Sequence, residues 1–256
     1  LSDYLGKDVT RVPLNDRETL KLFSGLESLG VTERQVGTKV GTFGISEFGT
    51  EFVRGMLVDT RPSSFADLIR ISGLSHGTDV WVNNAQEIIR NGCAPLHDCI
   101  CCRDDIMIYL MEKGIAPFDA FTIMEKVRKG RGLTPEQETI MREHNVPDWY
   151  ITSCARIKYM FPKAHAVAYV INAFRIAYCK VHHPEAFYAT AFTVSRKALD
   201  VLTIPHGAKA IRRRIKEMLS VGGRRNLKAN DQRVLEVLEL ALEMTARKIR
   251  MRQIDI

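Results

Sequence analysis

The chain has 256 residues, of which 45% are hydrophobic, so it can bury one large core or two smaller ones. No apolar run approaches the 18 residues of a membrane span, and the first residues lack the character of a signal peptide, so we expect a cytoplasmic chain without a membrane partner. The net charge of +7 favours a polyanionic partner, nucleic acid before membrane.

The N-terminal part predicts little regular structure. A short extended piece is expected around 10–13, and Asn15 or Asp16 can cap a helix over about 17–24. Residues 30–45 are rich in Gly and Thr, which predicts a loop with at most one short strand. The chain also lacks an initiating Met, so we expect a piece of a longer protein.

Helix signals dominate the rest of the chain. Ser46 can cap one helix, Ser63 or Ser64 the next, and Thr134 with Gln137 forms a capping box for a later one. The predicted fold is all-α, an irregular assembly of about ten helices. The helices expected after residue 45 cover about 47–60, 64–72, 83–91, 103–113, 117–128, 134–144, 147–158, 162–183, 185–194, 206–220 and 230–250.

The helix over 162–183 is the centre of the functional argument. At roughly 100° per residue, one broad side is apolar, and the positions that share it are Ala166, Val167, Val170, Ile171, Ala173, Phe174, Ala177, Tyr178 and Val181. The opposite side carries His165, Tyr169, Asn172 and Arg175. Pro162 suits the first position of a helix, and free N–H groups beside Lys163 and His165 would receive an anion such as a phosphate. An ordinary core helix with a solvated basic face is the alternative.

Two loops carry further candidate contacts. Residues 72–79 are polar and bracketed by Gly73 and Gly77, so a loop there can bring N–H groups and hydroxyls close to a ligand, although a plain turn explains the pattern too. Residues 128–132 form a basic, glycine-rich loop of the kind that follows a sugar-phosphate backbone, or a solvated helix end.

The start of the helix over 103–113 carries three charges. Asp104 and Asp105 suit the positive end of the helix dipole, whereas Arg103 opposes it and is expected to have a partner. No Asp-x-Asp pair that would hold two catalytic metal ions is present, and adjacent helical positions such as Asp104 and Asp105 point about 100° apart. The residues alone therefore indicate a helical binding module for nucleotide or nucleic acid.

The six cysteines do not follow a zinc-binding spacing. Cys93, Cys99, Cys101 and Cys102 cluster without a C-x2-C knuckle, and His97 sits between the first two. We expect free thiols and no metal ligands, with a cysteine-based metal module as a third reading.

Several runs resemble one family in order along the chain. They are ISEFGTEFVRGML with TRP (45–62), ISGLSHGTDVW (71–81), CRDDIMIYL (102–110), VRKGRGLTPE (127–136), VPDWYITSC (146–154), KYMFPKAHAVAYV with RIAYCKVHHP (158–184) and VLELALEM (237–244). These resemble the PolC-type DNA polymerase III α subunit, the replicative C-family polymerase of low-GC Gram-positive bacteria. The match covers nearly the whole chain and is weakest at 196–232, and the family usually has Gly where Cys101 stands.

The resemblance implies the fingers of that polymerase. Residues 1–45 would connect palm to fingers, 46–195 would form the fingers core, and 196–256 would lead to the next DNA-binding region. The family's Mg²⁺ is bound by the palm and the dNTP, so no catalytic residue is expected in this chain, which alone would be inactive. The implied partners are dNTP, primer-template DNA, the remaining polymerase domains (with 3′→5′ exonuclease in the full protein) and the sliding clamp.

The resemblance also implies two sets of contacts. The residues expected at the dNTP are Ser72, Gly73, Ser75, His76, Gly77, Thr78, Arg103, Phe161, Lys163, His165 and Tyr169. The residues expected at the DNA backbone are Lys126, Arg128, Lys129, Arg131, Lys158 and Arg175. The competing interpretation is a stand-alone helical DNA-binding module without nucleotide specificity.

Overall fold

The computed structural model describes residues 2–6, 8–220 and 222–251. In these residues the fold is all-α, as predicted, and no strand is formed beyond one isolated bridge between Thr78 and Tyr159. The α-helices are α1 Ser2–Leu5, α2 Arg17–Lys21, α3 Glu33–Val36, α4 Glu51–Thr60, α5 Phe65–His76, α6 Gln86–Arg90, α7 Arg103–Glu112, α8 Pro117–Arg128, α9 Pro135–Glu143, α10 Asp148–Arg156, α11 Lys163–His182, α12 Pro184–Val194, α13 Ala208–Leu219 and α14 Ala229–Ala246. Single 3-10 turns cover Val9–Arg11, Glu27–Leu29, Arg196–Ala198, Ile204–His206 and Arg224–Asn226.

The chain forms two compact units. Unit 1 comprises Leu1–Arg54 and Ala173–Ile256, and unit 2 comprises Gly55–Asn172. The sequence-based division at residues 45 and 195 remains a prediction. Within the described residues, no helix combines the length and the apolar character needed to span a bilayer.

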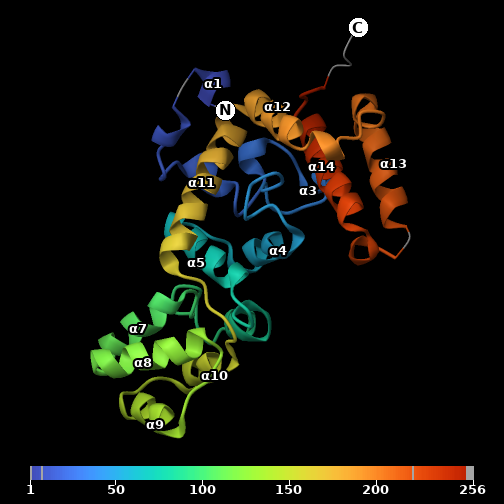
Figure 1. Cartoon of the computed structure of the whole chain (residues 1–256). Coiled ribbons are helices and arrows are strands. Elements are labelled where there is room, and N and C mark those ends of the chain that lie inside the picture. The colour runs from blue at the N-terminus through green and yellow to red at the C-terminus, as the bar shows by residue number, and fades with distance from the viewer. Residues whose placement is uncertain (1, 7, 221, 252–256) are drawn as a thin grey trace. The chain divides into compact units, whose positions relative to one another are not determined.

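Unit 1 is built on a cluster of aromatic rings and on α14. The ring of Phe23 meets Phe48 edge-on at 5.1 Å between centroids and stacks on Phe174 at 6.2 Å. Leu235 and Leu238 of α14 are fully buried in the same unit. Helices α13 and α14 pack side by side, as Figure 1 shows in orange and red.

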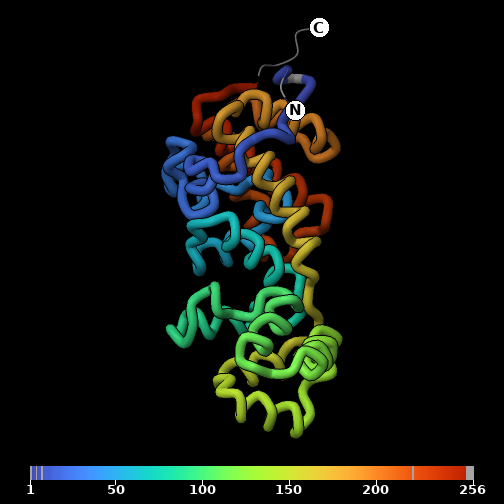
Figure 2. The backbone as a smooth tube through the Cα atoms, turned by 90° about the vertical axis from the view of Figure 1, so that its left-hand side faces the viewer, coloured from blue at the N-terminus to red at the C-terminus, as the bar shows by residue number. Residues whose placement is uncertain are grey.

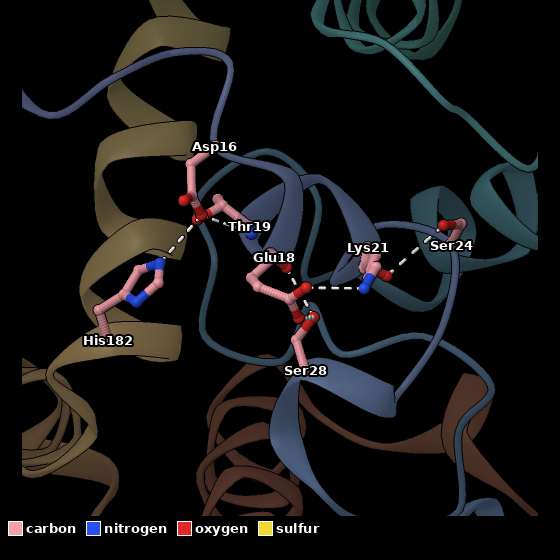
Figure 3. Close-up of polar contacts among 7 residues, drawn as sticks. All are labelled: Asp16, Glu18, Thr19, Lys21, Ser24, Ser28 and His182. Atoms are coloured by element: carbon pink, nitrogen blue, oxygen red, sulfur yellow. Dashed lines mark hydrogen bonds and ion pairs between the residues drawn. The ribbon is translucent and has the colours of Figure 1, made fainter.

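Short polar contacts hold α2 in unit 1. Asp16 caps the helix by accepting from the N–H and the hydroxyl of Thr19, and it also contacts Nε2 of His182 at 2.9 Å (Figure 3). Ser28 donates to the carbonyl of Glu18 at 2.6 Å. Although burial opposes its charged form, the contacts with His182 and Thr19 keep the pKa of Asp16 below its ordinary value. Of the two predicted caps, Asp16 is the one used.

Unit 2 contains the pair α7 and α8, which lie side by side in both views (Figures 1 and 2). Their facing residues include Ile106 and Leu110 of α7 and Ile123 and Val127 of α8, all buried. Pro117 is the first residue of α8, where its missing N–H leaves no hydrogen bond unmade. Gly114 turns the chain between the helices with φ 86°.

The central helix forms as expected. Ala166, Val170 and Ala177 are fully buried, whereas Tyr169 on the other side is 43% exposed. Two further positions expected on the apolar side, Ala173 and Phe174, are also fully buried, while the residues at that side's margins are half-buried, namely Val167, Ile171, Tyr178 and Val181.

Four local predictions outside the candidate site are wrong. The loop expected over 30–45 contains the short helix α3, Glu33–Val36. The extended piece near 10–13 is instead the 3-10 turn Val9–Arg11, which Asp8 caps through the N–H of Thr10. Helix α4 begins at Glu51 rather than after Ser46, because Glu47 adopts a left-handed φ of 69° and breaks the helical path.

The fourth error concerns the helix expected over 83–91. Residues Trp81–Ala85 form an irregular turn, in which Asn83 has φ 57°, and the regular helix starts only at Gln86. The amide of the buried Asn84 donates to the carbonyls of Asp79 and Ser153, which stabilises the turn.

Candidate functional site

The segment 158–163, which precedes α11, joins the predicted contact residues within unit 2. Thr78 donates its N–H to the carbonyl of Tyr159 at 2.9 Å and accepts from the N–H of Lys158 at 3.1 Å. Met160 donates to the carbonyl of Arg128 at 3.3 Å. The ends of α5 and α8, far apart in sequence, therefore meet on this segment.

The predicted loop over 72–79 is wrong in its first half, because α5 continues to His76. The apolar face of α5 continues through residues 72–76, so Ser72 is only 1% exposed. A Cβ atom on Gly73 would lie 2.6 Å from the carbonyl oxygen of Cys101, which shows that the helix approaches that segment directly. The hydroxyl of Ser72 is buried and has no hydrogen-bond partner among the described residues.

The second half of the segment is more accessible. Ser75 and His76 are half-buried and Thr78 is exposed. Ser75 donates its hydroxyl to the carbonyl of Ser72 at 2.9 Å, and Nδ1 of His76 contacts the same oxygen at 2.8 Å, which orients the imidazole. Gly77 packs so closely that a Cβ there would lie 2.3 Å from the side chain of Val80.

Three rings stack at this place. His76 lies over Phe161 with 4.6 Å between centroids and an interplanar angle of 22°, and Tyr169 lies 6.0 Å from Phe161 at 19°. His165 meets Phe161 edge-on at 5.9 Å. Since Tyr169 is 43% exposed, the stack offers a flat, accessible surface of the kind on which a base or sugar rests.

The start of α11 is already occupied by carboxylates of the chain. Asp104 accepts from the backbone N–H of Lys163 at 3.0 Å, and Asp105 contacts Nζ of Lys163 at 2.7 Å. The expectation of free N–H groups there is therefore wrong for Lys163. Burial opposes its charged form, but the Asp105 carboxylate raises the pKa of Lys163 above its ordinary value. The lysine is held charged and in place.

Arg103 also differs from its prediction, which was that its side chain has a charge partner. Its backbone N–H lies 3.4 Å from the carbonyl of Phe161, but among the described residues its half-buried guanidinium makes no ion pair. The two carboxylates that follow it in sequence are turned to Lys163 instead. Within the described residues the Arg103 guanidinium thus has no ion-pair partner, and its backbone contacts Phe161 of the ring stack.

Arg70 is a site residue that sequence reasoning missed. It is half-buried on α5, makes no ion pair within the described part of the chain, and acts electrostatically on both Lys163 and Cys102. It precedes Gly73 by three residues, so it lies one helical turn away on the same face. That spacing is the signal that would have found it.

The predicted DNA-backbone residues form a second group in unit 2, with one exception. Gly130 has φ 67°, and a Cβ there would lie 2.4 Å from the carbonyl oxygen of Lys158, so the basic loop lies directly against Lys158. Lys129 and Arg131 are exposed. Arg175 belongs to unit 1, where it donates to the carbonyl of Thr10.

Glu125 holds two of these cations. Arg128 contacts it through Nε and Nη2, and Lys129 through Nζ at 2.8 Å. Hydrogen bonds from Arg128 and Lys129 lower the pKa of Glu125 to about 2. The Arg128–Glu125 pair is half-buried, whereas Lys129 is exposed and its pair with Glu125 contributes little stability. Lys126 is half-buried and makes no ion pair within the described residues.

The cysteines do not assemble into a metal site in the described residues, where no group of three or more His, Cys, Asp or Glu side chains is placed to hold an ion. Cys99, Cys101 and Cys102 are buried free thiols, and Cys93 is exposed. Burial raises the pKa of Cys99 and of Cys102 to about 12. They behave as small apolar core residues.

Comparisons with known proteins agree on one family. Residues 3–146 match the family model described as the bacterial DNA polymerase III alpha subunit finger domain. The chain is 55% identical over 256 residues to "DNA polymerase III PolC-type" of Clostridium perfringens and 54% identical over 256 residues to the protein of that name in Bacillus subtilis. In Thermotoga petrophila the identity is 55% over 247 residues, 96% of this chain. The chain spans 18% of the length of each of these curated relatives.

Proposed function

This chain belongs to the finger domain family of the bacterial DNA polymerase III alpha subunit, and we propose that it binds the incoming dNTP and the template strand in a template-directed DNA polymerase. The observation that carries the proposal is the stack of His76, Phe161 and Tyr169 beside Lys163 and Arg103. An aromatic surface together with cations, of which Lys163 is held in place by Asp105, matches the two ends of a nucleoside triphosphate.

In the proposed complex the sugar and base rest near the exposed ring of Tyr169, with His165 and Thr78 at the margin. The triphosphate contacts Lys163 and Arg103. Arg70 is a third candidate contact, because it is close enough to act electrostatically on Lys163. An arginine without an ion pair can hold two phosphate oxygens at once. These cations neutralise the negative charge that grows on the departing pyrophosphate, which lowers the barrier to nucleotide transfer.

The carboxylates of this chain do not fit the divalent ion that such a polymerase requires, for which we propose Mg²⁺. Asp104 and Asp105 are the carboxylates at the start of α11, and both are engaged by Lys163. We therefore assign metal binding and catalysis to other parts of the longer polypeptide, so that this chain alone is inactive. The same proposal makes primer-template DNA, the other polymerase domains and the sliding clamp its partners, in the cytoplasm.

The basic loop of residues 128–132 and Lys158 are proposed to contact the template backbone. They are accessible cations, and the close approach of Gly130 to Lys158 brings them together. Phosphate contacts of this kind position the strand without sequence preference. Lys126 belongs to the same group by position, whereas Arg175 is a separate contact in unit 1.

The test measures dNTP affinity of the full-length polymerase that contains this chain, by calorimetry or by fluorescence of a labelled dNTP. We expect Lys163→Ala and Arg103→Ala each to weaken dNTP binding by ~1–3 kcal/mol, the cost of one charge-assisted hydrogen bond. Lys113→Ala is the matched control, because Lys113 is an exposed cation of unit 2 that lies over the ring of Tyr109.

The result also separates the two functions that the sequence left open. A stand-alone DNA-binding module predicts similar small losses of DNA binding from any single Lys or Arg, and no selective loss of dNTP. Equal dNTP affinity in the Lys163, Arg103 and Lys113 variants would overturn the proposed nucleotide site.

A further inference from the structure

Helix α13 in unit 1 carries a stripe of cations that none of the proposed contacts includes. Lys209, Arg212, Arg213 and Lys216 stand at positions i, i+3, i+4 and i+7, and all four are exposed. At 100° per residue they fall within an arc of about 100°. We call these four residues the α13 stripe.

The other side of α13 explains why the stripe faces solvent. Ile211 is fully buried, and Ile215 and Met218 are half-buried, on the side of the helix opposite the stripe. Helix α13 packs along α14 within unit 1 (Figure 1). An amphipathic helix held by its apolar side presents its charged side outward.

The charge around the stripe is poorly compensated. Between residues 209 and 228 Glu217 is the only acidic residue. It lies 3.9 Å from Arg213 and 3.7 Å from Arg214, and Arg214 has a second partner in Asp200 at 3.5 Å. The cations of this segment are Lys209, Arg212, Arg213, Arg214, Lys216, Arg224, Arg225 and Lys228. Of these, Arg224 is paired with two acids from outside the segment, Glu51 at 3.2 Å and Glu239.

Two members of the stripe, Lys209 and Lys216, make no ion pair within the described residues, and Arg212 donates only to the neutral carbonyl of Gln35. Arg225 and Lys228, in the segment between α13 and α14, are also exposed and unpaired there. The stripe therefore keeps nearly its full positive charge.

We propose that the α13 stripe binds the phosphate backbone of duplex DNA, as a contact separate from the nucleotide site. From Lys209 to Lys216 the helix rises about 10 Å, which corresponds to the rise of about three nucleotides of one strand along the axis of the duplex. The choice of DNA as the polyanion rests on the proposed function. The stripe itself is defined by its own geometry and lies in unit 1, whereas the nucleotide site lies in unit 2.

The make-up of the stripe favours DNA over an acidic protein. Protein interfaces have an apolar centre within a polar rim, whereas at 100° per residue no apolar residue of α13 falls within the arc that these four cations span. A hollow of about 440 Å³ beside the helix is lined by Arg213, Ala210 and Leu202, and Leu202 is 82% exposed. An acidic peptide would use that hollow, so the test includes it as the alternative.

The experiment uses the full-length polymerase that contains this chain and a fluorescent DNA duplex. The dissociation constant is measured between about 50 and 200 mM salt, a range over which a protein with about 6–10 phosphate contacts loses roughly 10³–10⁵-fold in affinity. Each phosphate contact adds about 0.9 to the slope of log affinity against log salt. We expect the variant Lys209→Gln/Arg212→Gln/Arg213→Gln/Lys216→Gln to reduce this slope by about 2–4.

The matched control removes four other exposed cations of unit 1 that make no ion pair in the described residues: Arg17→Gln/Arg34→Gln/Lys39→Gln/Arg250→Gln. We expect this control to keep the wild-type slope. The single change Glu217→Gln removes the nearest acid and is expected to tighten DNA binding severalfold.

Three results would overturn the proposal. The first is that the stripe variant, shown to be folded by its thermal melting, keeps the wild-type salt slope. The second is that the control variant loses as much slope as the stripe variant. The third is that the stripe variant keeps DNA binding and instead loses binding of polyglutamate. The dNTP affinity of the same preparations separates the two proposals, because the stripe variant should keep it. A wild-type polymerase that binds duplex but no dNTP would contradict the nucleotide site alone.

Discussion

Lys180 shows how far one residue can depart from its sequence context. It belongs to the basic interval around α11, yet its side chain is fully buried in unit 1. Its Nζ lies 2.7 Å from Glu243 and donates to the carbonyls of Gly41 and Phe43 at 2.7 and 2.6 Å. Tyr188 donates to the same carboxylate at 2.7 Å. The lysine holds a loop against α11 and α14 and is not part of a solvated surface.

We predict that Lys180→Met destabilises the chain by about 3–5 kcal/mol, because Glu243 is left as a buried charge and two carbonyls lose their donor. Urea unfolding measures the effect. The double variant Lys180→Met/Glu243→Leu should be less destabilised than the sum of its single changes, since no charge is then left unpaired. Additive losses, or a single-variant loss below about 1 kcal/mol, would contradict this account of the pair.

At the scale of elements, glycines decide how closely helices approach their neighbours. Gly73 of α5 and Gly55 of α4 both lie inside helices, but their surroundings differ. A Cβ on Gly73 would lie 2.6 Å from the carbonyl oxygen of Cys101 and 2.5 Å from Sγ of Cys102, whereas a Cβ on Gly55 would meet nothing within 4 Å. The first glycine permits close packing, and the second only weakens its helix.

We predict opposite effects of the same substitution at these two positions. Gly73→Ala should destabilise the chain by roughly 1–3 kcal/mol, because backbone atoms must move apart. It should also weaken dNTP binding, since α5 carries His76 at its end. Gly55→Ala should stabilise by about 0.5–1 kcal/mol through helix propensity alone. The melting temperatures of both variants test this prediction. Equal shifts in melting temperature would mean that the close approach of α5 to Cys101 is not rigid.

At the scale of the whole molecule, the free cysteines report burial in both units. Cys179 lies in unit 1, and the other five lie in unit 2. Burial raises the pKa of each buried thiol, to about 12 for Cys99 and Cys102, whereas Cys93 is exposed. A thiol with a pKa near 12 is thiolate in only about 1 molecule in 10⁴ at pH 8.

We therefore predict that iodoacetamide at pH 8 modifies Cys93 alone in the folded chain and all six cysteines in urea, as read by mass spectrometry. Because the thiol pKa is about 9.0 unfolded and higher when folded, the stability linked to these thiols is complete below about pH 9.0 and is lost as the pH rises towards 12. Rapid labelling of Cys101 or Cys154 in the folded chain would show that the core is open.

Local signals were sufficient for the elements that form where the chain provides its own caps. The sequence alone predicts a cap at Ser63 or Ser64, the capping box at Thr134, the start of α8 at Pro117 and the apolar face of α11, because each depends on neighbours within a few residues. It fails at Trp81–Ala85, where a buried Asn84 bonds to Ser153, 69 residues away.

In the candidate site, too, local sequence signals predict some features and long-range contacts determine the others. The residue types and their motifs determined which side chains are candidates for a nucleotide, and by themselves they identified the family. Only the tertiary structure decided that Asp104 and Asp105 turn to Lys163, that Arg103 makes no ion pair in the described part of the chain and that Lys180 is buried. These outcomes depend on which groups, distant in sequence, meet in space. Lys163 and Asp105 are 58 residues apart, and an ion pair over such a separation produces no periodic pattern in the sequence.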